Sequence, residues 1–262
     1  MTVQVLVATM NQTDYSLLER MNIQTDAIVC NQCDRYGYSE FDYNGHNIKW
    51  FNFAERGVGL NRNNALMRAT ADIVVFADDD VVYVDGYEKI ILDFYEKNQK
   101  ADVVIFNFNV SRGSANYGEN VKLTERLNSR KALKFGTYAI TARNERLKMM
   151  NINFNRCFGG GTKFSCGEDT LFLKDCCAKL VVFSSVNLIG KVDHGESTWF
   201  KGYTDKYFYD KGVLYYCLDS RKCKIISLYH CFKHRRQYKE YGWKKAYKMM
   251  KKGIKTVKSN FK

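Results

Sequence analysis

Short apolar runs alternate with helical patterns along the first hundred residues. The apolar runs are rich in β-branched residues and end in polar clusters, which is typical of buried strands. The predicted strands cover residues 3–9, 26–30, 47–53, 72–77 and 102–106. The predicted helices between them cover residues 15–21, 59–70 and 86–97. This alternation predicts an α/β fold with a mostly parallel sheet flanked by helices.

The rest of the chain is less regular. Residues 107–128 are polar and predict a loop or an irregular strand. Further predicted elements are a strand over 137–141, helices over 144–150 and 168–180, and one or two strands within 181–189. From residue 198 the pattern is helical to the end. We therefore divide the chain into an α/β domain over residues 1–220 and a helical tail over residues 221–262.

The tail carries most of the chain's net charge of +13. Residues 233–262 contain twelve Lys or Arg and one acid, a net charge of +11. Apolar residues recur there at intervals of three and four, at Trp243, Tyr247, Met250, Ile254, Val257 and Phe261. Such a basic amphipathic helix is suited to an anionic membrane interface. The alternative is a helix packed on its own domain with its lysines in water. No nucleic-acid-binding fold signature accompanies the charge, so we expect no nucleic-acid partner.

Composition and cysteine usage predict a cytoplasmic protein. No apolar run reaches the ~20 residues that a membrane-spanning helix needs. The N-terminal residues enter a strand pattern without the basic and apolar regions of a signal peptide. The nine cysteines are an odd number, and we interpret them as reduced thiols. Together with the tail, these features predict a protein that is peripheral at the inner face of the cell membrane.

Polar side chains follow three of the predicted strands. They occupy residues 9–11, 31–34 and 78–80. Ligands of parallel α/β sheets bind beyond the carboxyl ends of strands, so we expect a nucleotide site here. The consecutive acids Asp78, Asp79 and Asp80 repel one another unless a cation lies among them. Mg²⁺ or Mn²⁺ prefers such oxygen ligands and commonly shares a substrate diphosphate. The alternative is a solvated acidic turn.

A second candidate cluster lies later in the chain. Glu168 and Asp169 open a predicted helix and follow a glycine-rich segment over 158–162. Acids in the first turn of a helix are also ordinary capping features. A flexible glycine loop that leads into a carboxylate suits a site where an acceptor hydroxyl is deprotonated.

Five motifs, in order, resemble the inverting glycosyltransferases of family 2, which have the GT-A fold and include bacterial surface-polysaccharide enzymes. The motifs are two strand ends at residues 7–11 and 28–34, a helix start at 57–65, a strand with a D-x-D motif at 74–80, and an E-D motif at 167–169. Ala8 replaces the family's usual proline, and Asn31 stands where the family often has Asp. The resemblance implies metal-dependent transfer from a nucleotide-sugar, most often UDP-linked, to a hydroxyl of a glycan or lipid-linked acceptor.

The resemblance also implies roles for single residues. Asp169 would be the general base, and Glu168 and Gly160 would help to bind the acceptor. Asp80 would bind Mn²⁺ or Mg²⁺, and His194, after a predicted strand, would complete the metal shell. The residues expected to bind the nucleotide-sugar are Thr9, Asn11, Asn31, Arg62, Asp78 and Asp79.

Two other functions fit the sequence less well. A sugar-phosphate nucleotidyltransferase normally has glycine and basic residues directly after its first strand, and residues 9–14 contain neither. A non-catalytic, membrane-docking relative would need no intact acids, yet Asp78, Asp80 and Asp169 are all present.

Overall fold

The computed structural model describes residues 1–112, 115–193, 195 and 202–260. The chain forms two compact units. The first comprises residues 1–156 and 168–196, and the second comprises residues 157–167 and 197–262. The predicted division at residue 220 falls inside the second unit, because helix α7 (Asp205–Leu218) groups with the C-terminal helices.

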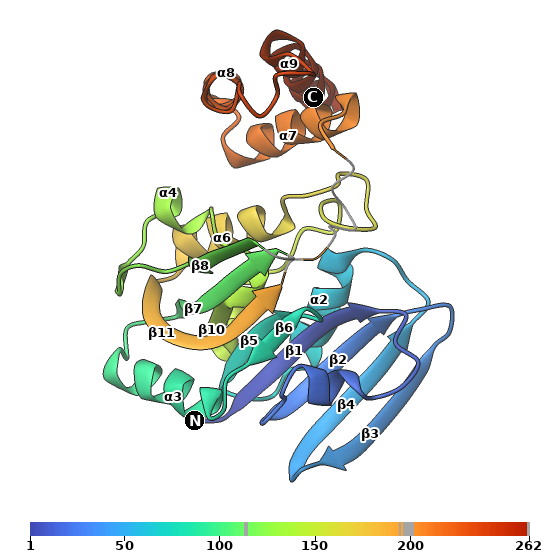
Figure 1. The fold of residues 1–262 in the computed structure, drawn as a ribbon, viewed down its shortest axis with the longest axis vertical. Helices are drawn as coiled ribbons and strands as arrows, with labels where there is room; N and C mark the ends of the chain where they lie inside the picture. The colour runs from blue at the N-terminus through green and yellow to red at the C-terminus, as the bar shows by residue number, and fades with distance from the viewer. Residues whose placement is uncertain (113–114, 194, 196–201, 261–262) are drawn as a thin grey trace. The chain divides into compact units, whose positions relative to one another are not determined.

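Among the described residues, eleven strands form one sheet at the centre of the first unit (Figure 1). Its strands are β1 Val3–Met10, β2 Asp26–Gln32, β3 Gly37–Tyr43, β4 His46–Phe53, β5 Ile73–Asp78, β6 Val81–Tyr83, β7 Val103–Arg112, β8 Ala115–Glu119, β9 Glu125–Arg126, β10 Ile140–Arg143 and β11 Val182–Asp193. Their order in the sheet is β3-β4-β2-β1-β5-β10-β7-β11-β6, while β8 pairs with β7 and β9 pairs with β11.

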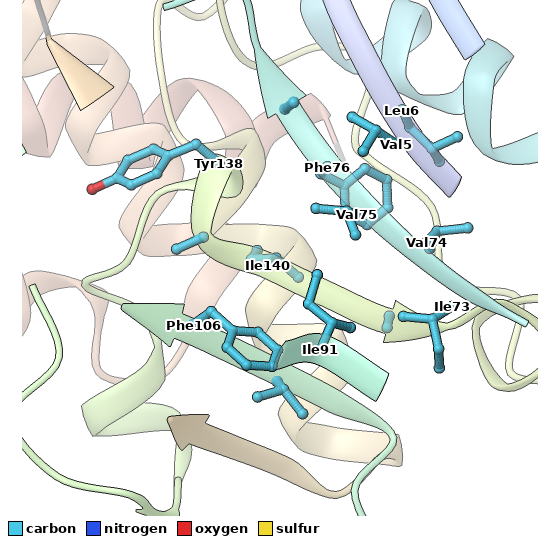
Figure 2. Close-up of a cluster of buried hydrophobic side chains, with 14 of the residues drawn as sticks. Val5, Leu6, Ile73, Val74, Val75, Phe76, Ile91, Phe106, Tyr138 and Ile140 are labelled. Carbon is cyan, nitrogen blue, oxygen red and sulfur yellow. The ribbon is translucent and has the colours of Figure 1, made fainter. Parts of the chain in front are cut away.

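Helices flank this sheet. They are α1 Leu17–Arg20, α2 Val58–Arg68, α3 Tyr87–Lys97, α4 Ser129–Ala132, the 3₁₀ turn η1 Thr137–Ala139, α5 Asn144–Met149 and α6 Glu168–Lys179. The core lies around β5, where every residue from Ile73 to Ala77 is buried, as Figure 2 shows for Ile73 to Phe76. Burial on both faces explains why this strand is a continuous apolar run rather than an alternating one.

Strand direction changes across the sheet. β4, β2, β1 and β5 are parallel, as the strand–helix alternation predicts. β10 lies antiparallel between β5 and β7, with Thr141 opposite both Val75 and Val104. Residues 137–139, predicted as strand, form η1 instead. Because β10 runs against β5, its first residues lie at the carboxyl end of β5.

Two hairpins were not among the predicted elements. β3 and β4 are joined by Asn44 and Gly45, which both have positive φ (54° and 83°). An Asn-Gly pair with this geometry is a strong hairpin signal. β7 and β8 form the second hairpin, within the part of the chain predicted as a loop or irregular strand.

The second unit is built on close contact between α7 and α9 (Trp243–Asn260). A Cβ atom added at Gly212 would lie 2.1 Å from the carbonyl oxygen of Met250, and one at Gly253 would lie 2.2 Å from that of Tyr209. The two helices therefore pack backbone against backbone. No described helix is both long and apolar enough to span a bilayer.

This packing buries the apolar stripe of α9. Met250, Ile254 and Val257 are all buried, while Phe261 lies outside the described residues. Trp243 and Tyr247, at the start of the same stripe, are half-buried against the core of the second unit. The described part of the stripe therefore packs within the second unit, and membrane binding by the tail stays a prediction. The alternative prediction, a packed helix with a lysine face in water, fits the structure.

His230 links the parts of the second unit through both ring nitrogens. Nδ1 lies 2.8 Å from the Tyr215 hydroxyl, and Nε2 lies 2.6 Å from the Tyr238 hydroxyl. His230 belongs to α8 (Cys223–Lys233), Tyr215 to α7, and Tyr238 to the segment before α9. Burial lowers the pKa of His230 to about 3, so the ring is neutral near pH 7.

Candidate active site

The acidic residues lie where β5 ends. Ala8 is opposite Asp78 in the parallel pairing of β1 and β5, so the ends of these strands meet. The Thr9 hydroxyl donates a hydrogen bond of 2.6 Å to Asp79 Oδ2. Burial raises the pKa of Asp79, and the charges of Asp78 and Asp80 act in the same direction, against the hydrogen bond from Thr9. The polar residues after β1 and β5 therefore lie together, as predicted.

Arg62 connects this strand end to α6. Its guanidinium donates hydrogen bonds to Asp78 Oδ1 (2.5 Å) and Glu168 Oε1 (3.1 Å), and only 4% of the residue is exposed. Its Cζ atom also lies 5.4 Å from the ring centroid of Phe154. Burial acts to lower the pKa of Arg62, but the two carboxylates more than compensate and raise it. Arg62 therefore stays charged and ties two acidic segments together.

Glu168 and Asp169 occupy the first turn of α6, as predicted. Burial raises the pKa of Glu168, the Asp169 charge raises it further, and Arg62 opposes both. Asp169 Oδ1 accepts hydrogen bonds from the backbone N–H (2.6 Å) and hydroxyl (3.2 Å) of Thr170. These bonds fix the orientation of the Asp169 carboxylate.

Tyr138 shows that the two acidic segments share one neighbourhood. Burial raises the pKa of this phenol, and the charges of Asp80, Asp78 and Asp169 raise it further. One side chain thus lies within electrostatic reach of carboxylates from both the β5 turn and α6. Its hydroxyl points away from the apolar cluster in Figure 2. Sequence analysis missed Tyr138, because its only signal there is an aromatic residue at the start of a predicted strand.

Asn31 is fully buried and holds neighbouring strand ends together. Its Nδ2 donates to Gln12 O (3.0 Å) and Asn52 Oδ1 (2.8 Å), and its Oδ1 accepts from the Gln12 N–H (3.0 Å). Gln12 also donates to the Thr9 hydroxyl (2.9 Å). Both amide protons of Asn31 are therefore used within the protein, which favours a positioning role over the expected contact with a nucleotide. Gln12 was missed because it lies in a loop without a recognisable pattern.

Three candidate residues remain: Asn11, Gly160 and His194. Asn11 is exposed directly after β1, with φ of 55°. Gly160 belongs to residues 157–167 of the second unit, and an added Cβ would meet no atom within 4 Å. His194 lies outside the described residues.

The acidic turn at Asp78, Asp79 and Asp80 offers carboxylate oxygens, which are the ligands that a hard divalent cation prefers. Within residues 1–112, 115–193, 195 and 202–260, no three His, Cys, Asp or Glu side chains converge as a preformed metal site. Mg²⁺ is commonly held by one or two carboxylates together with substrate phosphates. The residues present therefore fit an ion that is completed by a diphosphate.

Comparisons with known proteins identify the fold and the family. The solved structures with similar folds include S. aureus TarS 1-349 with UDP-GlcNAc, which is 13% identical with a TM-score of 0.64, and with UDP, which is 14% identical with a TM-score of 0.61. Each match covers 99% of this chain and 92% of the TarS chain. No curated protein sequence matches. A sequence model described as glycosyl transferase family 2 matches residues 35–180, more than half of the chain. The chain therefore belongs to glycosyl transferase family 2, and the protein is a glycosyltransferase that uses a nucleotide-sugar.

Proposed function

We propose that the enzyme transfers one sugar from a UDP-sugar to a hydroxyl of a glycan or lipid-linked acceptor, with inversion at the anomeric carbon. The observation that carries this proposal is the convergence of the β5 turn and the start of α6 on Arg62 and Tyr138. A single displacement needs the donor-binding acids and the acceptor-activating acid in one site. TarS, which has the same fold, was crystallised with UDP-GlcNAc and with UDP, and this supports a UDP-linked donor.

Asp169 acts in this proposal as the general base. It takes the proton of the acceptor hydroxyl as that oxygen attacks the anomeric carbon. The hydrogen bonds from Thr170 hold the carboxylate in one orientation, which reduces the cost of positioning it. Glu168 helps to orient the acceptor, and no covalent enzyme intermediate is needed.

Asp78 faces the ribose or base of the donor, with its carboxylate oriented by Arg62. Because the Arg62 guanidinium already contacts two carboxylates, its role is to position these acids. Thr9 orients Asp79 in the same way. Mg²⁺ or Mn²⁺, with Asp80 and His194 as candidate ligands, would supply positive charge that stabilises the leaving diphosphate.

The test is sugar transfer and slow hydrolysis with a panel of UDP- and GDP-sugars, with and without Mn²⁺. Asp169→Asn should lower kcat by about 10²–10⁴-fold and leave UDP binding intact, because only the base is lost. Asp80→Asn should weaken Mn²⁺-dependent UDP binding. Asp175→Asn is the matched control, because Asp175 is an exposed acid on the same helix. Transfer that persists at the control rate in Asp169→Asn would overturn the base assignment.

We also propose that the enzyme works at an anionic membrane surface at the inner face of the cell membrane. The exposed lysines of α9 support this, since each basic residue near such a surface contributes ~1 kcal/mol. Deleting residues 233–262 would remove the packing partner of α7, so flotation with vesicles should use Lys→Gln variants of exposed α9 lysines instead. If these variants float with vesicles as the wild type does, the α9 lysines do not bind the membrane.

A further inference from the structure

Helix α8 presents an exposed apolar stripe. Ile225, Leu228, Tyr229 and Phe232 lie at helical intervals of three, one and three, and their exposed fractions are 71%, 43%, 63% and 56%. Their spacing places them on one face of the helix. The opposite face, at Cys223, Ser227 and Cys231, is buried within the second unit. The stripe is thus directed away from the packed side of α8.

Basic side chains border the stripe along both edges. On a helical projection of α8, Lys224 lies beside one edge, and Lys222 and Lys233 lie beside the other. Arg235 follows in the turn after the helix, and all four side chains are exposed. The Arg235 Cζ atom lies 4.5 Å from the ring centroid of Phe232, and Lys233 Nζ lies 5.8 Å from that of Tyr229. Residues 221–239 contain seven Lys or Arg and no acid.

This combination identifies the chemistry of the occupant. Apolar side chains flanked by long cations match a bilayer interface, where the stripe enters the acyl boundary and the cations reach anionic headgroups. A second copy of this chain would bring the same positive charge to the same face, which disfavours self-association. Within the described residues, α9 offers exposed lysines without an exposed apolar stripe, since its stripe residues are buried or half-buried against the second unit.

We propose that α8 is the membrane-docking element of this enzyme and that Ile225, Leu228, Tyr229 and Phe232 insert into an anionic bilayer interface. The inference rests on the proposed membrane location and is independent of the proposed sugar transfer. In this proposal α8 supplies the apolar anchor, and α9 contributes only the positive charge of its lysines.

The experiment measures binding of the full chain to phosphatidylcholine vesicles with and without phosphatidylglycerol. A stripe variant carries Ile225→Ser, Leu228→Ser, Tyr229→Ser and Phe232→Ser. Its matched control carries Met67→Ser and Leu123→Ser, two exposed apolar residues of the first unit (67% and 64% exposed). The stripe variant should lose at least about tenfold in partitioning into anionic vesicles, while the control should bind like the wild type. Circular dichroism and thermal melting check that all variants are folded.

A tryptophan probe reports insertion directly. The wild type, with its three tryptophans, provides the baseline emission. Relative to that baseline, Tyr229→Trp should add blue-shifted emission on anionic vesicles that brominated lipids quench, whereas Met67→Trp should add neither effect.

Each other outcome identifies which proposal fails. Absence of wild-type binding to either vesicle would overturn both the membrane location and the role of α8. Equal binding of the stripe variant and the wild type would overturn the α8 assignment and keep the membrane location. A wild-type dimer that the stripe variant converts to a monomer would assign the face to self-association and overturn the proposal. Sugar transfer in solution is measured separately, so its failure is distinguishable from all three.

Discussion

Replacing Arg62 by Met should destabilise the first unit and disconnect the acids of the active site. The substitution keeps the stem that packs near Phe154 but removes the charge shared by Asp78 and Glu168. Removing one partner of a buried ion pair typically costs 3–5 kcal/mol. The Glu168 side chain is 14% exposed and remains poorly hydrated, whereas that of Asp78 is 34% exposed and regains water. We therefore expect the lower end of the range, about 3 kcal/mol.

The loss of stability in Arg62→Met should also depend on pH. Burial already raises the pKa of Glu168, and loss of Arg62 removes an opposing charge, so this pKa rises further. An acid whose folded-state pKa lies above its unfolded value destabilises the protein when ionised, and this cost disappears as pH falls. The difference between Arg62→Met and the wild type should therefore be smaller near about pH 5 than near about pH 8.

Hydrogen exchange of the buried β5 amides measures the opening free energy of the first unit. The matched control is Arg68→Met on the same helix, because Arg68 bonds Asn64 of its own helix and stacks near two aromatic rings without a buried carboxylate. This control should lose less than about 1 kcal/mol. A loss of similar size in both variants, or a deficit that grows toward acidic pH, would refute the reasoning.

Three further predictions concern single residues. Asn31→Ala leaves the Gln12 backbone amide without its buried acceptor, so the opening free energy of β1 should fall by about 1–3 kcal/mol; protection within error of the wild type would contradict this. Gly253→Ala should lower the thermal stability of the second unit by about 1–3 kcal/mol because its Cβ meets backbone, whereas Gly160→Ala should melt like the wild type. His230 has a folded-state pKa of about 3, below its unfolded value of 6.5. The neutral ring therefore contributes its full stabilisation above pH 6.5, and this stabilisation is lost as pH falls toward 3. The second unit should lose about 1 kcal/mol between about pH 7 and pH 5, after allowance for partial hydration, and His230→Gln should flatten this dependence.

The parallel half of the sheet could be predicted because burial on both faces imposes a simple rule. The sequence runs that form β1, β2 and β5 are continuous and apolar. Because these strands are parallel, their carboxyl ends lie at one edge of the sheet, and the polar residues after them meet there. Thr9 and Asp79 therefore lie in contact although seventy positions separate them.

Long-range pairing explains what could not be predicted. The direction of β10 depends on which strands it lies between, and local periodicity carries no such information. The role of Asn31 likewise depends on Gln12 and Asn52, which only the fold brings near. The α9 stripe was recognised correctly as an apolar helix face, but periodicity cannot tell a membrane from α7 as the partner that covers it.

The reversed strand β10 also affects how this enzyme could be re-engineered. Because β10 begins at the carboxyl end of β5, the 3₁₀ turn η1 directly before it lies at the same edge of the sheet as the acids and is not part of any strand. Exchanging η1, with Tyr138 in it, would change the side chains beside the acids while the strand pairing of the sheet stays unchanged. The route to altered donor selectivity would then be a graft of a few residues at one rim.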